Sequence, residues 1–181
     1  MRTTGCDRRA LDASESCAPV RLEAAELPRL GWVWVVREVT GALRELHLAG
    51  LAGQDVPGEA QDLDEDLREA LELYEQGSDA ALWALPLAPA GTSFGSLVRE
   101  AMRAIPRGEV RTYGQLATAV AAPGAARAVG RACATNPLPL VVPCHRVVAS
   151  TGPGGFGPGL DAKRALWSLE GMDVAMRAGF R

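Results

Sequence analysis

Alternating apolar and polar residues mark the first third of the chain. The run Trp32-Val33-Trp34-Val35-Val36 is rich in β-branched and aromatic residues, which favour strands. Thr40-Gly41 suits a turn, and residues 42–48 resume with a partial alternation of apolar and polar positions. This pattern predicts a β-hairpin, with His47 on its solvent side.

A helical period follows the hairpin. From Asp62, apolar residues recur on one helical face until the pattern ends at Gly77, so we expect a helix between them. Residues 85–91 are rich in proline and small side chains, which predicts a crossing into a second lobe. The expected N-terminal α/β lobe spans 19–88 and follows a tail, residues 1–18, whose lack of periodicity predicts disorder.

The second lobe, residues 89–181, is expected to be mostly helical. Ser93 is the expected N-cap of a helix with apolar residues at helical spacing. Thr112 and Gln115 have the spacing of a capping box, and another short helix is expected from Ala125 to Ala134. Two short helices joined by a tight turn predict a helix-turn-helix. The predicted fold class is α+β.

An apolar run over residues 138–148 is interrupted by Pro143-Cys144-His145-Arg146. The apolar flanks predict that this turn is anchored inside the fold. A glycine-rich loop, residues 151–159, follows it without a phosphate-binding glycine pattern, so we interpret the loop as a pocket lid. The last helix carries Glu170 near its C-terminal end, where it opposes the helix dipole. This position predicts a partner for the carboxylate, such as His145.

Composition limits the class of protein. The chain has 181 residues, of which 48% are hydrophobic and 23% charged, as in ordinary globular proteins. It has neither an apolar run that could span a bilayer nor a secretory signal, so we predict a cytoplasmic protein without membrane contact. Four cysteines without a CxxC pair predict reduced thiols. Cys6, Cys17 and His47 match no familiar zinc spacing, and we expect no metal and no cofactor.

Charge is divided unevenly along the chain. Residues 1–100 hold 9 Lys and Arg against 18 Asp and Glu, whereas residues 101–181 hold 10 against 4. A basic half suits a lobe that faces nucleic acid, and a solvated basic face explains it as well. In the expected helix-turn-helix, Arg127 and Arg131 share one helical face among small residues. Both interpretations stay open on charge alone.

The interrupting turn carries the candidate chemistry. Cys144, His145 and Arg146 place a thiol, an imidazole and a guanidinium in consecutive positions. Neighbouring cations lower the pKa of a thiol, and the thiolate is the nucleophile. A lone cysteine–histidine pair is more often a buried structural thiol beside a polar turn, so the surrounding sequence has to decide.

The surrounding sequence resembles one family, the O6-alkylguanine-DNA alkyltransferases, also called methylated-DNA–protein-cysteine methyltransferases. Pro143-Cys144-His145-Arg146 with its flanking valines, preceded by Asn136-Pro137, is similar to their active-site signature. The resemblance covers residues 86–172, with further motifs in the same order. These are Gly91-Thr92-Ser93-Phe94, Arg103-Ala104-Ile105-Pro106, Thr112-Tyr113-Gly114-Gln115-Leu116-Ala117, Ala125-Ala126-Arg127-Ala128-Val129-Gly130, Lys163 and Leu169-Glu170-Gly171.

The resemblance implies a DNA repair protein. The implied reaction moves the alkyl group of O6-alkylguanine in duplex DNA to Cys144 after base flipping, irreversibly and once per molecule, with O4-alkylthymine as a further substrate. The residues implied in the reaction are Cys144, His145 as base through a water, Glu170 orienting it, Tyr113 as proton donor to guanine, and Asn136 bracing the turn. Those implied in DNA binding are Arg127 filling the gap, Ala126, Thr112, Arg131 and Gly130. Those implied around the alkylated base are Tyr113, Val147, Phe156 and Gly157.

The chain departs from the family in the lid. Phe156 and Gly157 stand where some members have a tyrosine and a serine, and the loop is one residue shorter than in some members. This predicts a roomier pocket for bulkier alkyl groups. The resemblance further implies a monomer in which Arg146 anchors the turn.

Three other interpretations compete with a transferase. A damage-recognition relative without activity typically lacks the cysteine, which is present here as Cys144. A transcription regulator would use only the helix-turn-helix. A Cys-His hydrolase would need an oxyanion hole, for which the sequence gives no sign.

Overall fold

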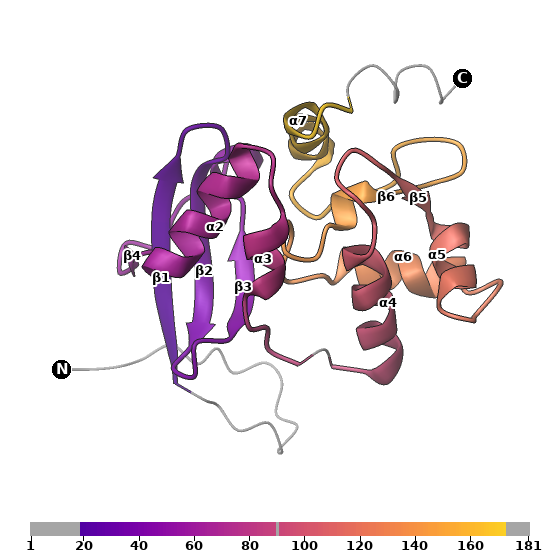
Figure 1. Ribbon diagram of the computed structural model, residues 1–181, viewed down its shortest axis with the longest axis horizontal. Coiled ribbons are helices and arrows are strands. Elements are labelled where there is room, and N and C mark those ends of the chain that lie inside the picture. Colours follow the sequence, from indigo (N-terminus) through magenta and orange to yellow (C-terminus); the bar gives the residue numbers. More distant parts are fainter. Residues whose placement is uncertain (1–18, 90, 173–181) are drawn as a thin grey trace.

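The computed structural model describes residues 19–89 and 91–172. The predicted disordered tail at 1–18, including Cys6 and Cys17, lies outside these residues. Figure 1 shows a sheet on one side of the molecule, with helix α2 (Glu65–Glu75) lying across it and α3 (Ala80–Ala84) between it and the helices of the second half. The mixed α+β fold class is confirmed.

The first half forms a four-stranded sheet in the order β3-β2-β1-β4. Its strands are β1 (Val20–Leu27), β2 (Gly31–Glu38), β3 (Leu43–His47) and β4 (Gln61–Asp62). The predicted hairpin is confirmed as the antiparallel pair β2–β3, in which Trp34 lies opposite His47. The alternation does not predict β1, because Glu23 on its core face is buried and pairs with Arg37 at 3.4 Å.

Helices make up most of the remaining structure. They are α1 (Ala49–Ala52), α2 (Glu65–Glu75), α3 (Ala80–Ala84), α4 (Ser93–Arg103), α5 (Tyr113–Ala119), α6 (Ala126–Ala134), the 3₁₀ turn η1 (Cys144–Arg146) and α7 (Leu160–Leu169). The predicted N-cap Ser93 is wrong by one residue. Thr92 caps α4 because its hydroxyl accepts the Gly95 N–H at 2.9 Å, and Ser93 is the first helical residue.

A two-stranded parallel sheet connects the segment that carries Cys144 (residues 138–146, the reactive turn) to the start of α5. It pairs β5 (Arg111–Thr112) with β6 (Val147–Val148), which follows η1 directly. Short strands this far apart in the chain carry no local sequence signal. Their pairing fixes where Tyr113, the first residue of α5, lies relative to Cys144.

The predicted pair of short helices is present as α5 and α6. The capping box of Thr112 and Gln115 is confirmed, with both of its hydrogen bonds formed. On α6, Val129 and Cys133 are buried, whereas Arg127 and Arg131 are exposed. The helix therefore packs one side inward and turns its two arginines to solvent.

One continuous apolar core runs through both halves. It includes residues of the sheet and α2 together with residues around the reactive turn, such as Leu46, Tyr74, Leu138, Val142 and Leu166. Within the described ranges, no helix is long and apolar enough to cross a membrane. The reactive turn is thus held between two halves that share a core.

The capping box yields a stability prediction. We expect Thr112→Ala to lower the free energy of unfolding by about 1 kcal/mol, because an N-terminal N–H of α5 loses its acceptor. Urea unfolding followed by circular dichroism measures the change. Thr118→Ala, which removes a hydroxyl bonded within the same helix to the Gly114 carbonyl, is the matched control. An equal effect of both substitutions would contradict the prediction.

Candidate active site

The reactive turn is built from backbone hydrogen bonds within an apolar setting. Leu140 has a φ of 72°, and the Val142 N–H donates to the Leu138 carbonyl at 2.8 Å. The Cys144 N–H then donates to the Val142 carbonyl at 2.7 Å, and η1 begins. Leu138, Leu140 and Val142 are all buried. The predicted anchoring of the turn inside the fold is correct, and Cys144 itself is 5% exposed.

Asn136 holds the turn from behind. Its Nδ2 donates to the Val142 carbonyl at 2.8 Å and to Cys144 Sγ at 3.0 Å, while its Oδ1 accepts the Leu138 N–H at 3.2 Å. The same amide therefore fixes the turn and contacts the sulfur. A donor on the sulfur stabilises the thiolate over the thiol.

The expected activation of the thiol by neighbouring cations is wrong. Burial raises the pKa of the Cys144 thiol, and the Asn136 hydrogen bond and the charge of Lys163 oppose it only in part. The Arg146 guanidinium turns away from the sulfur and binds carboxylates instead. The resting side chain is thus a neutral thiol, which has to lose its proton to become a nucleophile.

His145 has the geometry of a base. Its ring is fully buried, and Nε2 lies 2.7 Å from Glu170 Oε1. Burial lowers the pKa of His145, although Glu170 opposes this shift, so the ring is neutral and its Nε2–H donates to the carboxylate. Among the described residues Nδ1 has no hydrogen-bond partner. A buried acceptor without a partner in this position is ready to take a proton.

Glu170 is the predicted partner of His145, and it also binds Arg146. Arg146 Nε lies 3.0 Å from Glu170 Oε2 and Nη2 lies 2.7 Å from Oε1. Burial alone would raise the pKa of Glu170, but the hydrogen bonds from His145 and Arg146, together with the charge of Arg146, hold it well below its usual range. Arg146 also donates to Asp79 Oδ2 at 2.5 Å and to the Ile105 carbonyl at 2.8 Å. Its expected place as a buried anchor agrees with this geometry.

A small cavity of about 190 Å³ opens onto the thiol. Its lining brings together Tyr113, Gly130, Cys133, Ala134, Cys144, Gly155, Phe156 and Gly157. The Tyr113 hydroxyl accepts the Gly155 N–H at 3.3 Å. An added Cβ at Gly154 would lie 2.7 Å from that hydroxyl, so only glycine allows this close approach of lid and tyrosine.

Val147 does not line this cavity. Its side chain is fully buried, and its carbonyl accepts a hydrogen bond from Lys163 Nζ at 2.6 Å. The sequence did not identify Cys133 as a pocket residue, because Cys144 and the lid lie far from it in the chain. Gly155 belongs to the glycine-rich loop that was predicted to be the lid.

Lys163 joins the lid to the reactive segment. Its buried ammonium donates to the carbonyls of Val147 and Pro153, each at 2.6 Å, and of Gly155 at 3.3 Å. Burial lowers its pKa to about 8, and the protonated form has the three donors that three carbonyls need. The sequence holds a signal for this role, because Lys163 is its single lysine and a compact ammonium fits where a guanidinium fork does not.

The residues expected to bind DNA lie on two sides of α6. Gly130 lines the small cavity, whereas Arg127 and Arg131 line a separate groove of about 860 Å³ between α6 and the start of α4. Ala126 begins α6 and is partly exposed, and Thr112 is the partly exposed N-cap of α5. One helix therefore separates the arginines from the thiol pocket.

His47 takes no part in this site. It is a partly exposed strand residue, as predicted, and its ring stacks on Trp34 with centroids 3.7 Å apart. Its Nε2 lies 2.9 Å from Glu45. Over the ranges 19–89 and 91–172, no group of three or more His, Cys, Asp or Glu side chains is placed to hold a metal ion.

Comparison with known proteins agrees with this geometry. Residues 93–172 match the family profile "6-O-methylguanine DNA methyltransferase, DNA binding domain". A methylated-DNA–protein-cysteine methyltransferase of Methanosarcina acetivorans is 43% identical over 121 residues, covering 65% of this chain and 77% of the relative. The chain belongs to the methylated-DNA–protein-cysteine methyltransferase family.

The alignments with other members of the methyltransferase family cover different shares of the two chains. The relative from Mycolicibacterium paratuberculosis is 38% identical over 146 residues, covering 80% of this chain and 73% of its own length. The match to the Haemophilus influenzae relative, 43% identical over 105 residues, covers 58% of this chain and only 59% of that protein. A crystal structure of Mycobacterium tuberculosis OGT in complex with DNA superposes with a TM-score of 0.68 at 31% identity, covering 85% of this chain and 94% of that one.

The role of Lys163 can be tested on the lid. We expect Lys163→Met to lower the free energy of unfolding by about 2 kcal/mol, because three carbonyls lose their donor. Amide hydrogen exchange in residues 152–159 should become faster, which mass spectrometry of peptides measures. Arg164→Met is the control, since Arg164 is exposed and, within the part of the chain that the structure describes, forms an ion pair only with Asp161 of the same helix. Unchanged exchange in the lid of Lys163→Met would exclude the fastening role.

Proposed function

We propose that this protein repairs DNA by moving the alkyl group of O6-alkylguanine in a duplex onto Cys144. The observation that carries the proposal is the thiol on the floor of a small cavity, held by Asn136 and adjacent in the chain to the free Nδ1 of His145. Family membership supports the same activity, because the relatives are named for it.

The proposed transfer is a displacement at the alkyl carbon. The Cys144 sulfur forms a bond to that carbon while the bond between carbon and guanine O6 breaks. The thiol proton passes through a water to His145 Nδ1, and the Tyr113 hydroxyl donates a proton to the guanine ring as the base departs. Asn136 stabilises the developing thiolate, and Glu170 keeps His145 in the tautomer that accepts at Nδ1. Since a thioether has no easy leaving group, each molecule reacts once.

The proposed DNA-binding element is the α5–α6 pair acting as a helix-turn-helix. The target base has to leave the duplex to reach a buried thiol, at an unstacking cost of a few kcal/mol. In the proposed complex α6 enters the minor groove, Arg127 fills the gap left by the base, and Arg131 and the Thr112 region contact the backbone. The exposure of both arginines beside the small residues Ala126 and Gly130 supports this docking.

We divide the chain into an N-terminal lobe, residues 19–88, and an alkyltransferase and DNA-binding domain, residues 89–181. The matched family profile, residues 93–172, supports the second boundary. The proposed protein acts as a monomer in the cytoplasm, where thiols stay reduced. O4-alkylthymine is a proposed second substrate, and the remaining lone pair of the Val147 carbonyl is a proposed acceptor from the base edge.

One mass measurement tests the transfer. We expect intact mass spectrometry, after incubation with a duplex carrying O6-methylguanine, to show one added methyl group that maps to Cys144. The Cys144→Ala variant should gain nothing, although Cys133 lines the same cavity, because burial raises the pKa of Cys133 to about 12. An unchanged mass of the natural protein together with tight binding to the lesion would instead indicate a damage-recognition protein.

Substrate range is the second test of this proposal. Phe156 lies across His145, with ring centroids 6.2 Å apart, and Gly157 adds no side chain to the cavity. We expect Phe156→Tyr to slow transfer from O6-benzylguanine about tenfold relative to O6-methylguanine, because the added hydroxyl narrows the pocket. Single-turnover rates on both duplexes measure the ratio. An equal ratio in the two proteins would rule out a roomier lid.

A further inference from the structure

A tyrosine from the N-terminal lobe reaches the catalytic network. Tyr74 lies near the end of α2, and its hydroxyl donates to Glu170 Oε1 at 2.8 Å, across 96 positions of sequence. The side chain is fully buried. Burial and the adjacent carboxylate raise the pKa of Tyr74 well above its ordinary value, so the hydroxyl keeps its proton and remains a donor.

The Tyr74 hydroxyl donates to the same carboxylate oxygen that accepts the hydrogen bond from His145. Glu170 Oε1 also accepts from His145 Nε2 and from Arg146 Nη2, each at 2.7 Å. Arg146 Nε reaches the same oxygen at 3.2 Å, so donors from three residues share it. Among the described residues, Tyr74 is the one of these three that comes from outside the reactive turn.

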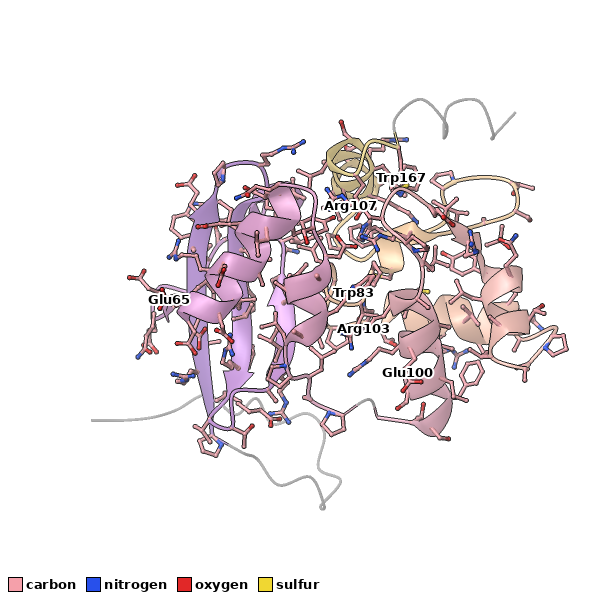
Figure 2. The ribbon with its side chains drawn as sticks, viewed as in Figure 1. Glu65, Trp83, Glu100, Arg103, Arg107 and Trp167 are labelled. Carbon is pink, nitrogen blue, oxygen red and sulfur yellow. The ribbon has the colours of Figure 1, made fainter. Side chains whose placement is uncertain are left out.

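A second contact from the same lobe holds the arginine of the network. Asp79, between α2 and α3, accepts from Arg146 Nη2 at 2.5 Å and from Arg107 Nη1 at 3.2 Å. Arg107 also donates to the Leu169 carbonyl at 2.8 Å, and its guanidinium lies 4.7 Å from the centre of the Tyr74 ring. Figure 2 shows Arg107 at this junction, between α2 and α7.

We propose that Tyr74 is a positioning residue for the alkyl transfer, which it serves by fixing Glu170 and by keeping His145 neutral with Nδ1 free. The effect of Tyr74 on the reaction rate rests on the proposed function. Its effect on the protonation state of His145 can be tested whether or not the protein transfers an alkyl group.

The physical basis is competition for one oxygen. A hydrogen bond to a charged carboxylate stabilises the charge and makes the oxygen a weaker acceptor for its other partners. Without the Tyr74 hydroxyl, more of the charge on Oε1 acts on His145 Nε2–H and favours the imidazolium. The other charged groups that act on His145 are Arg146 and Lys163. Arg146 already donates to Oε1 and Lys163 donates to backbone carbonyls, so both are already engaged when the Tyr74 hydroxyl is removed.

Tyr74→Phe is the direct test, because it keeps the ring over Arg107 and removes only the hydroxyl. The chain has two histidines, so the ¹⁵N imidazole signals of His145 can be followed by NMR, with His47→Gln to assign them. We expect the natural protein to hold the Nε2–H tautomer. In Tyr74→Phe the pKa of His145 should rise by about half a unit, and the acid limb of the single-turnover rate should shift upward equally.

The neighbouring Glu75 supplies a matched control. Glu75 is also buried on α2, but it accepts from the Arg29 and Leu30 N–H groups within the N-terminal lobe. Glu75→Gln should loosen that lobe and leave both the His145 titration and the pH profile of transfer in place. A shift in this control equal to that of Tyr74→Phe would mean that any loosening of the lobe moves His145, and would overturn the proposal.

Fluorination provides a test in the opposite direction. The chain has two tyrosines, so fluorotyrosine in a Tyr113→Phe background labels Tyr74 alone and makes its hydroxyl a stronger donor. The pKa of His145 should then fall. An unmoved His145 titration in both modified proteins would refute the positioning role. If the natural protein transfers no alkyl group, the proposed function fails, while the NMR titrations still decide the role of Tyr74.

Discussion

The hydrogen bonds to the buried carboxylate of Glu170 hold the site together. A carboxylate in an apolar interior is costly unless several donors satisfy it. Glu170 receives them from His145, Arg146 and Tyr74, that is, from the reactive turn and from the opposite lobe. The two halves must therefore pack together before the carboxylate is satisfied. This requirement explains why a charge network sits inside a continuous apolar core.

Burial has two opposite effects at the neighbouring residues Cys144 and His145. It raises the pKa of the thiol and lowers that of the imidazole, because a low-dielectric interior disfavours both charged forms. Both side chains are therefore neutral at rest. The Cys144 thiol carries a proton, and His145 Nδ1 can accept one. A neutral resting thiol also suits the proposed single reaction of each molecule.

Helix α6 divides the surface into two regions of different chemistry. One side supplies small residues to the thiol cavity, and the other supplies Arg127 and Arg131 to an open groove. Lys163 fastens the lid over the first region through backbone carbonyls alone. Lid residues such as Phe156 can therefore vary without loss of that fastening. The proposed breadth of the substrate range follows from this arrangement, because the residue that holds the lid is not one of the residues that line the pocket.

Features that depend on local pattern could be predicted from the amino-acid sequence. Periodicity identified the β2–β3 hairpin, the long helices and the capping box at Thr112, and the dipole conflict of Glu170 predicted its bond to His145. The sequence pattern misplaced the cap of α4 by one residue. It also missed β1, because Glu23 interrupts the apolar pattern of that strand and is buried only through its ion pair with Arg37 of β2. Such local signals need only nearby residues, and the Pro-Cys-His-Arg motif is among them.

The groups that act on the thiol could not be predicted in this way, because they depend on how distant elements pack. The sequence suggested that His145 and Arg146 lower the pKa of Cys144, but the fold turns Arg146 toward Asp79 and Glu170 and buries the sulfur. Residues that are adjacent in sequence need not shift each other's pKa, because side-chain direction and burial depend on distant elements. Tyr74 shows the converse: no spacing in the chain relates it to Glu170, yet packing of α2 against the end of α7 brings their oxygens to 2.8 Å.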